Sequence, residues 1–171
     1  MDTFLLRLHQ SQIAHQCRAA LWALDLAQRA LNEGDGDHFW TAVQNALSAA
    51  ANISKGLWGQ SGSLAQERKP LRDSLEITDD SIFTTTTLRN HIDHYDERLD
   101  RWYNTSNRKI FVGFNIGSSV GGINPTDMFL NSDANGDEVT FWNDRYSLAD
   151  LRKALETLLP VATKEADQSP W

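Results

Sequence analysis

The stretch Glu33-Gly34-Asp35-Gly36-Asp37 decides the fold, because it separates two long helical patterns by only three residues. Glycine occupies two of these three positions and stops the first helix, and Asp37 offers a carboxylate that can cap the next one. Two consecutive helices with so short a break pack most simply as an antiparallel pair. The sequence therefore predicts a helical hairpin at the start of the chain.

Apolar side chains recur along both predicted helices at the spacing of one buried face. The first helix spans residues 3–33, and its stripe consists of Leu6, Ile13, Cys17, Ala20, Leu24, Ala27 and Leu31. Gly56 is expected just beyond the end of the second helix, whose buried side carries Phe39, Trp40, Val43, Leu47, Ala50 and Ile53.

The middle of the chain is expected to hold a loop and two further helices. Residues 58–69 are rich in Gly, Ser and Gln and predict a surface loop. Pro70 suits the first position of a short helix that ends near Leu75. A longer helix is expected to run to about Tyr103, with an apolar stripe spaced by four and three residues: Leu88, Ile92, Tyr95, Leu99 and Trp102.

Strand patterns follow after Asn107. Residues 109–116 predict a strand, and Asn135-Gly136 predicts the tight turn of a hairpin. Ser147 is expected to cap a last helix that Pro160 closes. We expect these strands to bury one aromatic face, formed by Phe111, Phe114, Phe129, Phe141 and Trp142.

The predicted fold class is therefore α+β, mainly α. Residues 1–105 are expected to form a bundle of long antiparallel helices. Residues 106–171 are expected to add a small antiparallel β-sheet and a C-terminal helix that pack on this bundle within one compact domain.

The chain has 171 residues, of which 40% are hydrophobic and 23% charged, and its formal net charge is −7. This composition is typical of a soluble globular domain, and the negative charge excludes general electrostatic attraction to nucleic acid. Cys17 is the only cysteine, so neither an intrachain disulfide nor a cysteine-based zinc site can form. The sequence shows neither a signal-peptide pattern nor a membrane-length apolar run, so we expect a cytoplasmic protein without membrane contact or cofactor.

Residues 88–102, Leu-Arg-Asn-His-Ile-Asp-His-Tyr-Asp-Glu-Arg-Leu-Asp-Arg-Trp, are the strongest functional candidate. Arg89, Asn90, His91 and His94 lie within six residues of one another. Phosphoryl chemistry needs a cation for the phosphate and a group that moves protons near neutral pH. The spacing also fits a solvated helix, because opposite charges four residues apart stabilise a helix by about 0.2–0.5 kcal/mol per pair.

The segment Arg89-Asn90-His91-Ile92-Asp93-His94 resembles the R-x(4–6)-H motif of HEPN domains. It has an arginine, then a polar residue, and a histidine five positions after the arginine. The resemblance covers roughly residues 1–105. It implies a metal-independent endoribonuclease of the toxin or defence type, acting on RNA as a homodimer, with an antitoxin or another protein as a further partner. It also implies that Arg89 binds the scissile phosphate, that His94 acts as general base or acid, and that Asn90 orients one of them, with His91 as an auxiliary residue.

Two other functions stay open on the sequence. A non-catalytic HEPN-like interaction or regulatory module is favoured by four carboxylates that would repel RNA: Asp93, Asp96, Glu97 and Asp100. A metal hydrolase would require His91 and His94 to share a metal with donors that converge from elsewhere in the chain. We expect no metal in this motif.

Overall fold

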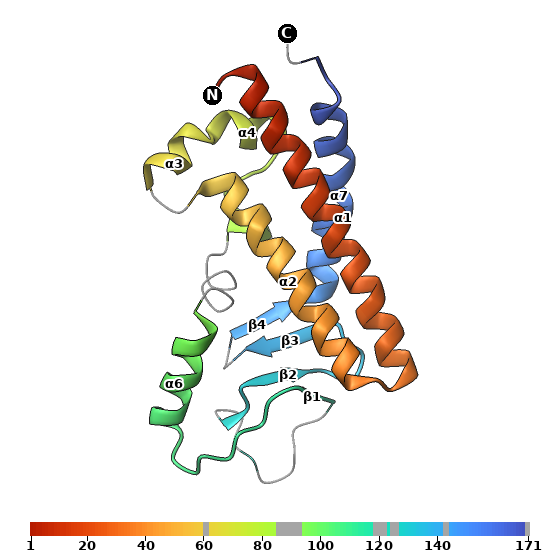
Figure 1. The fold of residues 1–171 in the computed structure, drawn as a ribbon, viewed down its shortest axis with the longest axis vertical. Helices are drawn as coiled ribbons and strands as arrows, with labels where there is room; N and C mark the ends of the chain where they lie inside the picture. Colours follow the sequence, from red (N-terminus) through yellow and green to blue (C-terminus); the bar gives the residue numbers. More distant parts are fainter. Residues whose placement is uncertain (60–61, 85–93, 118–122, 124–126, 142–143, 170–171) are drawn as a thin grey trace.

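The computed structural model describes residues 1–59, 62–84, 94–117, 123, 127–141 and 144–169. The protein is mainly helical with a small sheet (Figure 1), which confirms the predicted α+β, mainly α fold class. Its elements follow in the order α1 (Thr3–Glu33), α2 (Gly36–Trp58), α3 (Gly62–Glu67), α4 (Lys69–Ser74), η1 (Ile82–Thr84), α6 (Tyr95–Thr105), β1 (Asn115–Ile116), β2 (Leu130–Ser132), β3 (Glu138–Phe141), β4 (Asp144–Ser147) and α7 (Leu148–Ala166).

Helices α1 and α2 form the antiparallel pair that the short break predicts (Figure 1). Gly34 follows α1 in the left-handed region, with φ 72°, and its N–H donates to carbonyl groups of the preceding turn. Asp35, and not Asp37 as predicted, caps α2, because its carboxylate accepts the N–H of His38 at 3.0 Å. The helix therefore begins two residues earlier than the sequence suggested.

Helix α2 also continues past Gly56, where the sequence predicted its end, and its C-cap is Gly59. A Cβ atom at Gly56 would lie 3.6 Å from Ile13 of α1. That distance is an ordinary van der Waals contact, so Gly56 lies where α2 packs on α1 inside the helix, and the prediction that it ends α2 is wrong.

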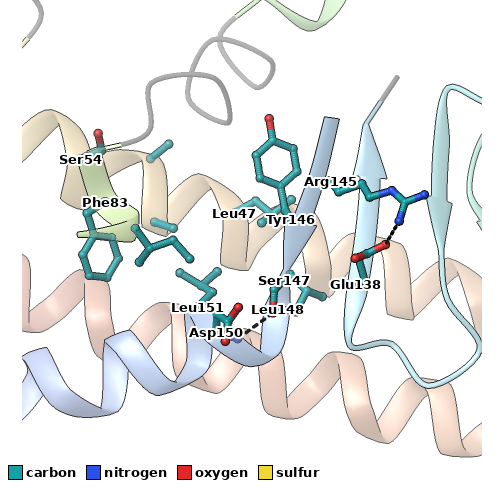
Figure 2. A pocket seen from close by; sticks show the side chains of 13 residues that line it. Leu47, Ser54, Phe83, Glu138, Arg145, Tyr146, Ser147, Leu148, Asp150 and Leu151 are labelled. Atoms are coloured by element: carbon teal, nitrogen blue, oxygen red, sulfur yellow. Dashed lines mark hydrogen bonds and ion pairs between the residues drawn. The ribbon is translucent and has the colours of Figure 1, made fainter. Parts of the chain in front are cut away.

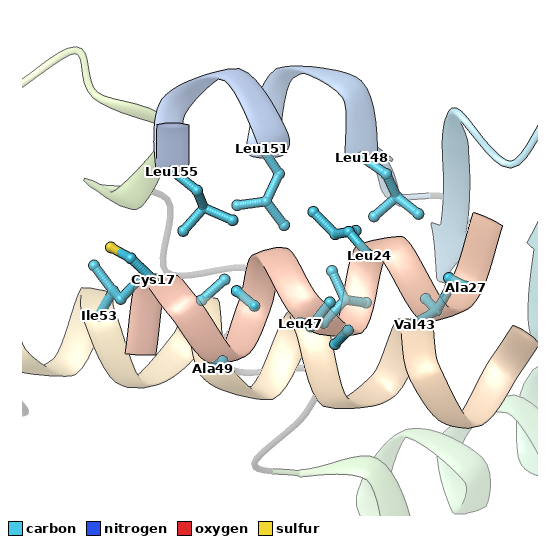
Figure 3. Packing of buried hydrophobic residues seen from close by; sticks show 14 of the residues in the cluster. Cys17, Leu24, Ala27, Val43, Leu47, Ala49, Ile53, Leu148, Leu151 and Leu155 are labelled. Carbon is cyan, nitrogen blue, oxygen red and sulfur yellow. The ribbon is translucent and has the colours of Figure 1, made fainter. Parts of the chain in front are cut away.

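Helix α7 packs along α1 and completes the core of the helical part (Figure 3). Three of its leucines face α1 and are buried: Leu148, Leu151 and Leu155. The same cluster of buried apolar side chains continues into the sheet through Phe129 and Phe141, so the helices and the sheet share one core.

Pro160 lies inside α7, which runs on to Ala166 instead of ending at the proline as predicted. A proline in a helix interior removes one backbone hydrogen bond. Here it lies on the exposed side of α7, where water can reach the freed carbonyl group. The turn after it is held by α1, because Nη1 of Arg7 donates to the carbonyl oxygen of Glu165 at 2.8 Å.

The middle of the chain agrees with the sequence only in part. Helix α4 matches the short helix predicted at Pro70, whereas α3 occupies part of the predicted loop, because residues 64–67 are good helix formers. The first half of the long helix expected to reach Tyr103 falls on residues 85–93 and lies outside the described residues. Its second half is α6, in which Trp102 is buried.

Strands β2 and β3 form the predicted antiparallel hairpin, and Gly136, with φ 73°, lies in the turn between them. Strand β4, which the sequence did not predict, pairs antiparallel with β3. Strand β1 instead runs parallel to β2, so the sheet is mixed, with the order β1-β2-β3-β4. The strand predicted over residues 109–116 is reduced to β1 and one isolated bridge before it. Positive φ angles at Lys109 and Phe114 interrupt the extended backbone there.

Helix α6 lies beside the sheet, on the side away from α1 (Figure 1). The ring of Tyr95 packs edge-on against Phe129 and Phe141, with centroids 5.3 and 5.8 Å apart. The ring of Trp102 packs against Phe111 at 5.0 Å. Aromatic side chains from the second half of the chain therefore fix α6. In the described part of the chain, no helix combines the length and the apolar character needed to cross a bilayer.

Candidate functional site

His94 lies within the described part of the chain, whereas the other predicted site residues, Arg89, Asn90 and His91, lie outside it. It is the N-cap residue of α6, but its side chain makes no capping hydrogen bond. The imidazole is 51% exposed, and its Nδ1 lies 3.3 Å from Oε1 of Glu97. A solvent-exposed histidine beside a carboxylate is able to exchange protons with a bound substrate.

Arg98 follows His94 by one helical turn and brings a guanidinium that the sequence analysis did not propose for the site. Its backbone N–H donates to the carbonyl oxygen of His94 at 3.0 Å, which places Arg98 one helical turn after the histidine. Its Nε is buried and has no acceptor among the described residues. The spacing of four residues after the histidine was the signal that could have identified it.

A tyrosine of strand β4 lies near this guanidinium. Burial, followed by the charge of Asp144, raises the pKa of Tyr146, whereas the nearby charge of Arg98 lowers it. The phenol is therefore protonated at neutral pH and close enough to Arg98 for their interaction to matter.

Two of the three carboxylates of α6 start away from the flank that Arg98 occupies, whereas the third, that of Glu97, lies beside His94. Asp96 and Asp100 each lie two residues from Arg98, which is about 200° around a helix. Electrostatic repulsion falls with distance, so a phosphate is repelled least on the side of Arg98. The acidic residues that oppose RNA binding in the sequence therefore do not surround the histidine evenly.

A cavity of about 240 Å³ lies between α2, the sheet and the start of α6. Trp40, Tyr95 and Phe141 give it aromatic walls, and Gln44 and Ser48 contribute polar groups. The indole N–H of Trp40 is buried and has no acceptor among the described residues. Because Tyr95 directly follows the candidate histidine, this cavity adjoins the segment that carries the imidazole.

A second cavity, of about 360 Å³, lies between α2, η1, β4 and the start of α7 (Figure 2). Tyr146 and Arg145 of β4 line it, and Nη1 of Arg145 lies 3.7 Å from Oε1 of Glu138. Ser147 caps α7 as predicted, since its Oγ accepts the N–H of Asp150 at 2.9 Å. The first N–H groups of α7 all have protein acceptors, so this helix end is not an open anion site.

The alternative of a metal site finds no support in the described part of the chain. Within those residues no three His, Cys, Asp or Glu side chains are grouped so that they could hold a metal. His91, which that alternative requires, lies outside them.

The aromatic residues expected in one sheet face divide into two groups. Phe129 and Phe141 are buried, as predicted. Phe111 and Phe114 are each 46% exposed, so the prediction that they join the core is wrong. Phe111 and Phe114 are three residues apart, so even a regular strand would have placed them on opposite faces, and positive φ angles at Lys109 and Phe114 interrupt the extended backbone that the prediction assumed. Trp142 lies outside the described residues.

Comparison of this chain with models of protein families, with curated proteins and with solved structures gives no match. The chemistry of the site is therefore inferred from its own residues.

Proposed function

We propose that this protein is a HEPN-like, metal-independent endoribonuclease in which His94 moves the protons of the reaction. The observation that supports this function most is the position of His94 at the start of α6. Its ring is half exposed, lies beside the carboxylate of Glu97 and precedes the guanidinium of Arg98 by one turn. RNA cleavage without a metal requires such a set: a group that transfers protons, a group that orients it, and a cation.

In the proposed reaction the ribose 2′-oxygen attacks the adjacent phosphorus, and the bond from phosphorus to the 5′-oxygen breaks. A base takes the proton of the 2′-hydroxyl, and an acid gives a proton to the departing 5′-oxygen. The products are a 2′,3′-cyclic phosphate and a 5′-hydroxyl. His94 acts as that base or acid, and Glu97 orients its ring by accepting a hydrogen bond from Nδ1 when that nitrogen is protonated.

The remaining roles come from the HEPN resemblance. Arg89 is proposed to bind the scissile phosphate, Asn90 to orient the phosphate or the histidine, and His91 to assist. Arg98 adds positive charge one turn from the histidine, where it offsets charge that develops in the transition state. The resemblance also implies a homodimer, in which two copies of the motif face each other across one cleft.

Cleavage of a fluorescent single-stranded RNA in the presence of a chelator tests this function. The wild-type protein should cleave the RNA, and His94→Ala should lower the rate by about a hundredfold or more, which is typical of a lost general acid or base. The control is His38→Ala, because His38 is also an exposed histidine with a carboxylate three residues away, at 2.6 Å from Asp35. This variant should cleave at the wild-type rate.

Two results would contradict the proposal. One is the absence of cleavage by the wild-type protein, and the other is equal cleavage by wild type and His94→Ala. A substrate with 2′-deoxyribose at the scissile position should resist cleavage, because the attacking hydroxyl is missing. An inactive protein that still forms a dimer would favour the alternative of a non-catalytic interaction module.

A further inference from the structure

Exposed large apolar side chains recur along the segment that leads from α6 to β1. They belong to Leu99, Tyr103, Ile110, Phe111 and Phe114, whose exposed fractions range from 37% to 55%. We call the three aromatic members, Tyr103, Phe111 and Phe114, the aromatic surface. Soluble proteins rarely leave such a group uncovered without a binding role.

Each ring of the aromatic surface is held at one side by a neighbour. Phe111 packs against Trp102 with centroids 5.0 Å apart, and Phe114 packs against Trp40 at 5.8 Å. The ring of Tyr103 lies under Nζ of Lys109, 3.7 Å from its centroid. About half of each ring stays accessible, so the rings are already positioned for a flat partner and lose little freedom when it binds.

The backbone keeps these rings outside the core at a cost. Lys109 and Phe114 have φ angles of 52° and 59°, in a region that residues with side chains rarely adopt. Such a conformation is energetically unfavourable and is typical of functional segments. A regular strand over residues 109–116 would have avoided this cost and alternated the phenylalanines between its two faces.

The charge around the aromatic surface differs from that of the whole chain. Residues 99–114 contain three cations, Arg101, Arg108 and Lys109, and one carboxylate, Asp100, in a chain whose net charge is −7. Asp127, whose Oδ1 accepts a hydrogen bond from Ser106, adds a second carboxylate beside this segment, which leaves an excess of one positive charge. A local positive excess beside exposed aromatic rings is complementary to a nucleic-acid strand, because phosphates pair with the cations and bases stack on the rings.

We propose that the aromatic surface binds single-stranded RNA through base stacking. The partner is single-stranded because the base faces of a duplex are already stacked and closed to aromatic side chains. This inference rests on the ribonuclease function proposed above, since the bound strand would be its substrate. Tyr103 lies eight residues beyond Tyr95, about 12 Å along α6, which three or four stacked nucleotides span at about 3.4 Å each.

Binding is tested in the His94→Ala protein, so that cleavage does not consume the ligand. The probes are fluorescein-labelled ten-nucleotide oligouridylate and oligoadenylate, followed by fluorescence anisotropy at low salt. Tyr103→Ala and Phe114→Ala should each weaken binding on the order of tenfold, as expected for one lost stacked base. The matched control is Trp22→Ala on α1, which removes an aromatic side chain that is 64% exposed and should leave the affinity unchanged.

Charge is tested separately with Lys109→Glu. This variant should weaken binding and lower the salt dependence of the affinity, because fewer counterions are released. Lys69→Glu is the matched control, since Lys69 is an exposed lysine of α4 far along the chain from the aromatic surface. A labelled RNA duplex should bind much more weakly than the single strands.

The outcomes separate this inference from the proposed function. If oligonucleotide binding depends on Tyr103 and Phe114 but the protein has no ribonuclease activity, the aromatic surface is supported as an RNA-binding site and the proposed enzyme function is refuted. If the wild-type protein cleaves RNA but the Tyr103→Ala and Phe114→Ala variants bind RNA like their parent, the aromatic surface is refuted as an RNA-binding site and the proposed enzyme function is supported. Equal affinity for duplex and single strand, or no oligonucleotide binding with dimerisation lost in Tyr103→Ala, would also overturn the inference.

Discussion

Replacing Arg7 by methionine should destabilise the protein by about 2–3 kcal/mol, although the side chain keeps a similar length. Nη1 of Arg7 donates to Oε1 of Gln10 at 2.9 Å and to the carbonyl oxygen of Glu165 at 2.8 Å. Nη2 donates to Oε1 of Gln168 at 2.7 Å. Gln10 is fully buried, and its Nε2 donates to Oγ of Ser74 at 2.8 Å. One polar chain thus joins α1, α4 and α7.

The expected magnitude comes mainly from the group that the substitution leaves behind. The Arg7→Met variant removes the guanidinium donor of the buried Gln10 carbonyl, and an unsatisfied buried acceptor costs about 1–3 kcal/mol. The lost contacts near the C-terminus of α7 are partly exposed and add about 0–1 kcal/mol. Replacing both Arg7 and Gln10 by methionine removes the acceptor as well. The double variant should therefore lose at least about 1 kcal/mol less than the sum of the two single variants.

Urea denaturation of the four proteins in this double-mutant cycle measures the free energies of unfolding. Arg18→Met is the control, because Nη2 of Arg18 donates to a surface hydroxyl, that of Thr163, at 3.1 Å. It should change the free energy by less than about 1 kcal/mol. A change within about 0.5 kcal/mol for Arg7→Met, or strict additivity of the two methionine substitutions, would refute this account of the polar chain.

Two further predictions concern single titratable groups. Burial raises the pKa of the Cys17 thiol to about 12. Its thiolate fraction near pH 8 is therefore about a thousandfold below that of a thiol with pKa 9.0. Ellman's reagent should modify Cys17 only in unfolding concentrations of urea. Rapid modification of the native protein would contradict the packing of α1. A hydrogen bond to Asp35, and then its charge, raises the pKa of His38, so Asp35→Asn should lower that pKa toward its ordinary value in an NMR titration. The stability that the protonated His38 adds in the wild-type protein should be lost as the pH rises through the raised pKa of His38. The stability from the backbone N–H groups that lower the pKa of Asp35 should persist above that pH and be lost only as the pH falls through the pKa of Asp35. An unchanged titration of His38 in the variant would show that the contact is absent in solution.

The helices were predictable from the sequence because their buried faces repeat at the helical period and their caps are local. Ser147 caps α7 by accepting the N–H of Asp150, and Gly34 ends α1 in the left-handed region. Both signals can be identified without knowing which helix packs alongside. The errors at Gly56 and Pro160 have the opposite origin. Helix α2 continues past Gly56 where it packs against Ile13 of α1, and the local pattern does not reveal that tertiary contact.

The candidate site was less predictable, because its important relations are not local. The sequence identifies His94 by residue type, and the contact with Glu97 three residues later follows from helical spacing. The proximity of Arg98 to Tyr146 joins residues 48 positions apart, and no periodic pattern encodes it. The exposure of Phe111 and Phe114 depends on two backbone angles rather than on residue type.

The expected division of the chain into a helical part, residues 1–105, and an extension, residues 106–171, does not describe the candidate site, because residues of both parts support α6. Tyr95 and Trp102, the inward-facing aromatics of α6, pack on Phe129, Phe141 and Phe111, which all come after residue 105. A chain cut at that residue would expose both rings to water, and α6, at 11 residues, is too short to be stable without packing. The strands are therefore part of the site's support, because they fix the helix at whose start the proposed catalytic histidine lies.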